Sequence, residues 1–151
     1  MSHSDRLAEL GITLPEVAAP VAAYVPAITV GNQVWTSGQL PFIDGELAAV
    51  GKLGAEISVE QGAAYARQCA LNALAAIDAL VGIDRVARVI KVVGFVASAE
   101  GFGQQAPVIN GASNLLGEIF GEAGAHARSA VGVAELPLNS PVEVELIVEI
   151  T

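Results

Sequence analysis

The residue whose surroundings most suggest chemistry is Arg128, which stands in a run of small residues that ends at Pro137. If this run is a strand, its side chains alternate between two faces, and Arg128 shares its face with small residues only. These are Ala130, Gly132 and Ala134. Small neighbours leave room beside a guanidinium, whose planar fork of donors suits bidentate binding of a carboxylate. The run therefore predicts a site for a small carboxylate.

A purely structural role for Arg128 is the alternative. Valine and glutamate alternate from Val142 to Glu149, so Glu143 or Glu145 could form an ion pair with Arg128 across the last two predicted strands. Both interpretations can hold, because a carboxylate partner would orient the arginine in an empty site. The alternation does not say which glutamate faces solvent.

The composition bounds the fold and the assembly. A chain of 151 residues is long enough for one domain with a real core, so we expect residues 1–151 to form a single domain. Hydrophobic residues make up 53% of the chain and charged residues 15%. This apolar content exceeds what a monomer of this size readily hides, so part of it is expected in a subunit interface.

The longest uncharged stretch, residues 17–43, is not expected to span a membrane, because Pro26, Gly31 and Pro41 interrupt it. Cys69 is the only cysteine, so a disulfide within the chain is excluded. Its simplest interpretation is a small core residue. We therefore expect a soluble, cytoplasmic protein.

Nucleic acids, metals and nucleotide cofactors are not expected as partners. The net charge is −9 and no basic cluster occurs, whereas binding to a phosphate backbone needs clustered cations. His3 and His126 are far apart in the sequence, and no zinc-binding or phosphate-cradling motif is present. His126 is interpreted as a surface residue, with a place in a ligand cleft as the alternative.

Strands are predicted at 25–30 and 33–37, separated by the turn residues Gly31 and Asn32, and a third strand is predicted at 46–50. Residues 1–16 carry a short amphipathic pattern and are expected to form a peripheral N-terminal extension.

A capping box at Ser58 and Gln61 predicts a long helix over 59–81 that ends at Gly82. A valine-rich strand is expected at 86–97, and Pro107 suits the first turn of a second helix. The last two strands are the Arg128 run and 142–150. This order predicts an α+β fold in which two helices pack on one face of one sheet.

Three separated segments resemble motifs of the Rid family, also called YjgF or L-PSP. Residues 30–41 are similar to its early strand with the TSGQ-P signature, and residues 127–145 to its C-terminal signature. Between them, Gln61 and Asn72 fall where the first helix of the family carries glutamine and asparagine.

The resemblance implies a chorismate-mutase-like fold with a mixed sheet, a homotrimer and ligand sites in clefts between subunits. Active members hydrolyse reactive enamines and imines, such as 2-aminoacrylate, to a 2-keto acid and ammonia without a cofactor. Ribonuclease activity and translation inhibition have been attributed to some members of the family. The acidic net charge and the lack of a basic patch argue against both activities in this chain.

By this resemblance, Arg128 holds the carboxylate of the substrate and Glu143 helps to handle the catalytic water. The positions expected to line the pocket are Tyr24, Ser37, Gly38, Asn110 and Ala130. Three of these residues also have a simpler interpretation: Glu143 as a solvated strand residue, Tyr24 as an ordinary strand aromatic, and Asn110 as a residue of the second helix.

Ala130 departs from the family pattern, because active members often carry a cysteine two residues after the arginine. Water is the nucleophile in imine hydrolysis, so the thiol is not required in principle. Its loss nevertheless keeps open a second function, which is binding or sensing of a small carboxylate, such as a 2-keto acid, without turnover.

Overall fold

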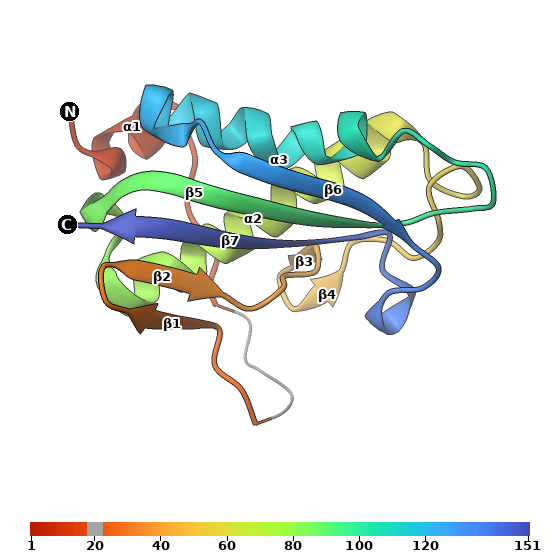
Figure 1. Ribbon diagram of the computed structural model, residues 1–151, viewed down its shortest axis with the longest axis horizontal. Helices are drawn as coiled ribbons and strands as arrows, with labels where there is room; N and C mark the ends of the chain where they lie inside the picture. The colour runs from red at the N-terminus through yellow and green to blue at the C-terminus, as the bar shows by residue number, and fades with distance from the viewer. Residues whose placement is uncertain (18–22) are drawn as a thin grey trace.

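The computed structural model describes residues 1–17 and 23–151, and its elements follow the predicted α+β pattern (Figure 1). Residues 18–22, which belong to the long uncharged stretch, lie outside the described residues. The helices and strands are α1 (His3–Glu9), β1 (Ala27–Val30), β2 (Gln33–Thr36), β3 (Phe42–Ile43), β4 (Glu46–Leu47), α2 (Val59–Val81), β5 (Val86–Ala97), α3 (Gln105–Phe120), β6 (Ala127–Val133) and β7 (Val142–Ile150). Short 3-10 helices are η1 (Ile83–Arg85), η2 (Gly121–Gly124) and η3 (Pro137–Asn139).

Five strands form one mixed sheet in the order β1-β2-β7-β5-β6. β5 and β6 run parallel and are joined by α3, as a parallel pair requires a crossover connection, and the other neighbours run antiparallel. The last two strands of the chain are therefore not neighbours, because β5 lies between them. β1 and β6 form the two edges of the sheet.

The predicted third strand is correct only in part. Residues 46–47 form β4, which pairs with β3 in a separate two-stranded hairpin, and residues 48–50 are not a strand. The sequence prediction missed β3. Asp44 and Gly45 connect the two strands with φ angles of 52° and 81°, and positive values at both positions are what a two-residue hairpin turn requires.

The first strand begins at Ala27 and not at Val25 as predicted, and the second ends at Thr36. Pro26 has no N–H to donate to a ladder. Its carbonyl instead accepts a hydrogen bond of 2.8 Å from the backbone of Ser37, which ties the start of β1 to the end of β2.

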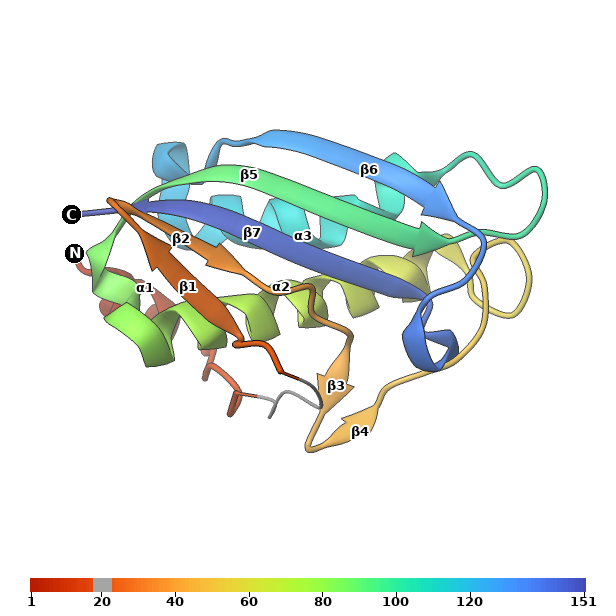
Figure 2. The same cartoon turned by 60° about the horizontal axis from the view of Figure 1, so that its bottom comes forward.

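The two long helices cover one face of the sheet, as predicted (Figure 2). α2 has the predicted bounds: its capping box is formed by Ser58 and Gln61, and Gly82 ends it at φ 88°. α3 begins two residues before Pro107 and ends before Gly121, which has a φ of 62°. The bounds of α2 could be predicted because caps are local chemistry.

The N-terminal helix α1 is a third helix, and it is docked against the end of α3. Leu7 is buried, Arg6 Nε donates a hydrogen bond of 2.8 Å to the carbonyl of Glu118, and the ring of His3 packs edge-on against Phe120. The extension is therefore held by both apolar and polar contacts.

The core lies between the helices and the sheet. Alternate residues of β7 are buried against the helices, namely Val142, Val144, Leu146 and Val148, and the glutamates between them are half-buried on the opposite face. Within residues 1–17 and 23–151 no helix lies over that opposite face, and Val30 and Trp35 are 58% and 47% exposed there. We call it the open face. No helix within the described residues is long and apolar enough to cross a membrane.

Candidate functional site

Arg128 lies on the helix-covered face of β6. Its partner across the parallel pair with β5 is Val92, which is buried against the helices, and Ala130 and Gly132 continue on the same face. The predicted alternation of this run is confirmed for these residues.

The face beside Arg128 is less open than the sequence predicted. Ala130 packs against the core, and a Cβ on Gly132 would meet the side chains of Gln105 and Ser98. α3 lies over this part of β6, so the small residues accommodate a helix as well as a guanidinium.

One nitrogen of the Arg128 guanidinium is anchored to α3. Its Nη1 donates to Oδ1 of Asn110 at 2.8 Å and to Oγ of Ser113 at 3.2 Å. The two partners are three residues apart, which puts them on the same helix face. Within the described residues no hydrogen bond occupies Nε or Nη2 of Arg128, so this edge of the guanidinium remains available.

The alternative interpretation, an ion pair between Arg128 and Glu143 or Glu145 across the last two strands, is wrong within one chain. β5 separates the strands that carry them, and the glutamates project from the open face, whereas Arg128 lies on the covered one. In the described part of the chain, ion pairs join Arg6 to Glu9 and Lys52 to Glu135 and do not include Arg128.

His126 belongs to the surroundings of Arg128 and is half-buried, which corrects its interpretation as a surface residue. Its Nε2 lies 2.8 Å from Oγ of Ser113, and its Nδ1 lies 2.6 Å from the carbonyl of Gly124. No local pattern indicates this contact, because it depends on how α3 lies across β6. The role of Ser113 was missed for the same reason.

Glu143 lies on the open face and is half-buried, opposite Phe95 of β5. Its carboxyl group lies directly over Gly38: a Cβ there would be 2.8 Å from both Cδ and Oε1 of Glu143. Burial, with a smaller contribution from the charge of Glu145, raises the pKa of Glu143.

The segment that follows β2 is fixed next to Glu143. Oγ of Ser37 donates a hydrogen bond of 2.6 Å to the carbonyl of Val25, and the backbones of Gln39 and Val144 exchange two hydrogen bonds. Tyr24 immediately precedes Val25, and its side chain is 49% exposed. Gly38 is thereby held against the strand that carries Glu143.

The predicted site residues thus form two groups. Arg128, Asn110 and Ala130 lie on or beside the covered face of β6, and Ser37, Gly38 and Glu143 gather on the open face. Within one chain the sheet separates the two groups.

Three other residues singled out by the sequence are structural. Gln61 caps α2, and the buried Asn72 donates from Nδ2 to the carbonyls of Leu40 and Phe42 at 3.0 and 3.1 Å, which fixes the turn after β2. Burial raises the pKa of the Cys69 thiol, which keeps it protonated, so its interpretation as a core residue is confirmed.

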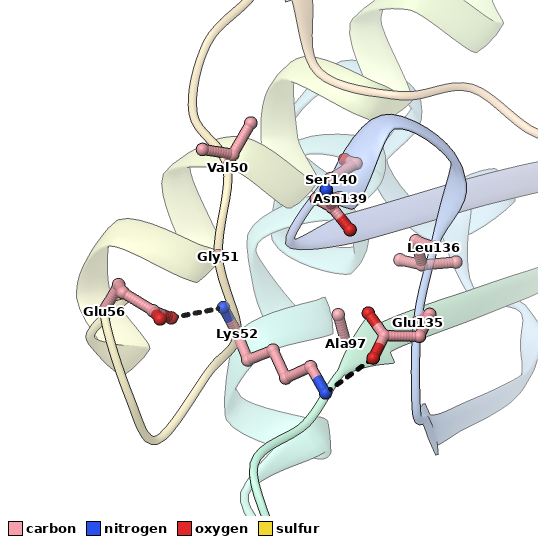
Figure 3. A pocket seen from close by; sticks show the side chains of 9 residues that line it. All are labelled: Val50, Gly51, Lys52, Glu56, Ala97, Glu135, Leu136, Asn139 and Ser140. Carbon is pink, nitrogen blue, oxygen red and sulfur yellow. Dashed lines mark hydrogen bonds and ion pairs between the residues drawn. The ribbon is translucent and has the colours of Figure 1, made fainter.

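Two hollows are present in the described part of the chain, and the second borders the surroundings of Arg128 through His126. One, of about 300 Å³, contains the ion pair of 3.0 Å between Lys52 Nζ and Glu135 Oε1 (Figure 3). The other, of about 570 Å³, lies beside the start of β6 and is lined by Arg88, His126 and Glu149 among others. Neither is lined by Arg128 or Glu143.

Known proteins resemble the chain over most of its length. Protein TCP17 of Trypanosoma cruzi is 47% identical over 146 residues, which cover 95% of this chain and 91% of that protein. A 2-iminobutanoate/2-iminopropanoate deaminase of Dermatophagoides farinae is 33% identical over 140 residues, which cover 92% and 94% of the two chains.

Solved structures share the fold. A protein of Shewanella oneidensis MR-1, solved under the name of an endoribonuclease, matches with a TM-score of 0.94 and 38% identity over 99% of this chain and all (100%) of that one. TdcF of E. coli, solved with bound serine, matches with a TM-score of 0.65 and 28% identity over 92% and 96% of the two chains.

The sequence profile of a family described as YjgF/chorismate mutase-like, with endoribonuclease also in its description, matches residues 4–150. The match covers all three motifs that carry the resemblance and extends to α1. Together with relatives at 47% and 33% identity, it confirms the family suggested by the sequence. The chain belongs to the YjgF/chorismate mutase-like family.

Proposed function

We propose that this protein hydrolyses small reactive enamines and imines of the 2-aminoacrylate type to 2-keto acids and ammonia. The observation that carries the proposal is the pattern of hydrogen bonds made by the Arg128 guanidinium. Its Nη1 is held by Asn110 and Ser113, while Nε and Nη2 have no hydrogen bond and no carboxylate partner within the described residues.

The free edge of Arg128 matches a carboxylate. Two parallel N–H donors on Nε and Nη2 fit the two carboxylate oxygens, and such charge-assisted pairs are the stronger kind of hydrogen bond. Because Nη1 is already anchored, less side-chain freedom is lost when the carboxylate binds. In this arrangement Asn110 orients the side chain of Arg128.

Glu143 is suited to moving the proton of a water molecule. Its raised pKa brings it closer to neutral pH, where a carboxyl group can both accept and return a proton. The enamine first becomes the imine by gaining a proton at its methylene carbon and losing one from its nitrogen, so that the C=C bond is replaced by a C=N bond. Water then adds its oxygen to the C=N carbon, and the nitrogen takes up a proton. The resulting carbinolamine loses ammonia as the C–N bond breaks and the C=O bond of the 2-keto acid forms. No cofactor and no thiol takes part, so Ala130 alters the shape of the site and not the reaction.

Arg128 and Glu143 act on one substrate only if they come from different chains, because they lie on opposite faces of the sheet. A site shared between subunits of a homotrimer meets this requirement, with Tyr24, Ser37 and Gly38 contributed beside Glu143. The exposed Ile28, Val30 and Trp35 of β1 and β2 supply apolar surface for the interface. We also propose that the protein is cytoplasmic.

Two relatives support this choice of substrate. The Dermatophagoides farinae relative is named as a deaminase of 2-iminobutanoate and 2-iminopropanoate, and TdcF was solved with serine, a ligand that carries a carboxylate. Nucleic acid is a poorer match, since the net charge of −9 repels a phosphate backbone.

The test is to generate 2-aminoacrylate in situ with a PLP-dependent lyase and to measure the rate of 2-keto acid release. The wild type should accelerate release, and Arg128→Ala should lower kcat/KM on the order of a hundredfold, since truncating one partner of a charged pair costs about 2–5 kcal/mol. Arg67→Ala is the matched control, because it removes an arginine on α2 that belongs neither to the Arg128 group nor to the Glu143 group.

No acceleration by the wild type, or an Arg128→Ala variant as active as the wild type, would overturn the proposal. If the wild type is inactive but 2-ketobutyrate still raises its Tm in an Arg128-dependent way, the protein is a carboxylate-binding module without turnover.

A further inference from the structure

Arg128 is the first member of a chain of hydrogen bonds that continues beyond its direct partners. Nη1 of Arg128 donates to Oγ of Ser113 at 3.2 Å, Oγ of Ser113 lies 2.8 Å from Nε2 of His126, and Nδ1 of His126 lies 2.6 Å from the carbonyl of Gly124. α3 contributes the serine, and the segment between η2 and β6 contributes the histidine. Ser113 and His126 are both half-buried, so water competes less for these bonds.

When the imidazole of His126 is neutral, the chemistry of the partners fixes the direction of every bond in this chain. A carbonyl oxygen only accepts, so Nδ1 of His126 carries a hydrogen, and in a neutral imidazole Nε2 is then an acceptor. Nε2 accepts the single hydrogen of the Ser113 hydroxyl, which leaves a lone pair of that oxygen for the N–H of Arg128. Each donor meets one acceptor when His126 is neutral and protonated on Nδ1.

A serine hydroxyl alone would hold Arg128 poorly, because it rotates freely between donating and accepting arrangements. His126 removes that freedom by taking the hydroxyl hydrogen and turning the lone pair of Ser113 toward the guanidinium. Asn110 accepts from the same nitrogen at 2.8 Å. With Nη1 fixed twice, the plane of the guanidinium and the direction of its Nε–Nη2 edge are set.

We propose that His126, acting through Ser113, is a positioning residue that orients Arg128 for the carboxylate of the substrate. This inference rests on the proposed function and deepens it, because it gives a role to Ser113 and His126, which lie outside the segments that resemble the family motifs. His126 touches neither the substrate nor the reacting atoms, so its effect should fall on carboxylate binding and not on the chemical step.

The kinetic test compares two substitutions of His126. His126→Phe keeps a planar ring and removes the acceptor, whereas His126→Gln keeps a non-titrating acceptor, its Oε1, near the position of Nε2. We expect His126→Phe to raise KM for the enamine about tenfold, the effect of one hydrogen bond to a charged group, with kcat changed less than about twofold. His126→Gln should recover most of the lost affinity.

Ser113→Ala provides the matched double-mutant cycle. It should raise KM at least as much as His126→Phe does, and the double variant should be no worse than Ser113→Ala alone, because His126 acts only through the serine. Additive losses in the cycle, or an unchanged KM in His126→Phe, would overturn the positioning role.

Two further measurements do not depend on turnover. Nitrogen-15 NMR of the histidine rings should find His126 protonated on Nδ1 at about pH 8, and a proton on Nε2 would overturn the inference. The dissociation constant of pyruvate, used as a carboxylate probe, should rise about tenfold in His126→Phe.

These readouts separate the two proposals. An inactive wild type that binds pyruvate in a His126-dependent way would refute enamine hydrolysis and support the positioning role. An active wild type whose His126→Phe variant keeps its KM and its pyruvate affinity would do the reverse.

Discussion

Among single residues, Gly38 links two of the family motifs, because it belongs to the TSGQ segment and lies against Glu143 of the C-terminal signature. The Glu143 carboxyl group occupies the space that any side chain at position 38 would need. A glycine in the TSGQ segment and a glutamate in the last strand are therefore parts of one arrangement.

Gly38→Ala should displace the carboxyl group of Glu143 and lower kcat/KM on the order of tenfold or more, since small misplacements of a catalytic group are costly. The Tm should change little, because the new methyl meets the flexible end of a side chain. Gly103→Ala is the control, since a Cβ there meets nothing within 4 Å. A fully active Gly38→Ala enzyme would show that the position of Glu143 is unimportant.

The raised pKa of Glu143 gives a prediction about stability. Burial and Glu145 raise this pKa, so the folded chain binds more protons than the unfolded one, and stability falls as pH rises through the interval between the two pKa values. Glu143→Gln is neutral at every pH. It should raise the Tm at about pH 7.5 and leave it nearly unchanged at about pH 4, below the unfolded-state pKa of glutamate.

Thermal unfolding at both pH values provides the measurement. Glu46→Gln, at an exposed position, is the matched control. If Glu143→Gln lowers the Tm at about pH 7.5, the carboxylate is stabilised in the folded chain, and its assignment as a proton carrier loses support.

Among single residues, the resemblance located Arg128 and Glu143 together with their neighbours Asn110 and Gly38, but the sequence did not predict which of them touch, and it missed Ser113. Which of the glutamates in β7 lies over Gly38 depends on strand register, and alternation leaves Glu143 and Glu145 equivalent. The contact of His126 with Ser113 depends on how a helix lies across a strand, which no local pattern encodes.

Among the elements, the approach of α2 and α3 is governed by Gly111. A Cβ on Gly111 would collide with the backbone carbonyl of Ala63, so the two helices could not remain at their present separation. Gly117 lies in the same helix, and a Cβ at that position would meet nothing within 4 Å. The two glycines of α3 therefore have opposite roles.

Gly111→Ala should destabilise the protein by about 2 kcal/mol or more, because overpacking against backbone cannot be relieved by a rotamer change. Gly117→Ala should stabilise it by up to about 1 kcal/mol through helix propensity. Urea denaturation of the wild type and both variants at one protein concentration checks both signs. A neutral Gly111→Ala would mean that the helices separate at little cost.

Local chemistry made the elements predictable and left their arrangement open. The limits of α2 followed from a capping box and a glycine stop, and the valines of β5 marked a covered strand. The pairing of the last two strands did not follow, because consecutive strands usually neighbour one another, whereas here β5 is inserted between them. The alternative interpretation of Arg128, an ion pair across these two strands, was wrong for that reason.

For the molecule as a whole, the separation of Arg128 from Glu143 matters most. The sheet places them on different faces, so under the proposed function a chain by itself would present two incomplete halves of a site. A cyclic trimer that brings the covered edge of one chain to the open face of the next would complete three equivalent sites. Catalysis would then require assembly.

Subunit complementation tests this account most directly. Arg128→Ala and Glu143→Gln chains, each inactive alone, are unfolded together in equal amounts, refolded and assayed for release of 2-keto acid from 2-aminoacrylate. In randomly mixed trimers, about a quarter of the sites would combine an intact Arg128 from one chain with an intact Glu143 from the next, so about a quarter of the wild-type activity should return. A mixture that forms trimers and remains as inactive as its parents would contradict a site shared between chains.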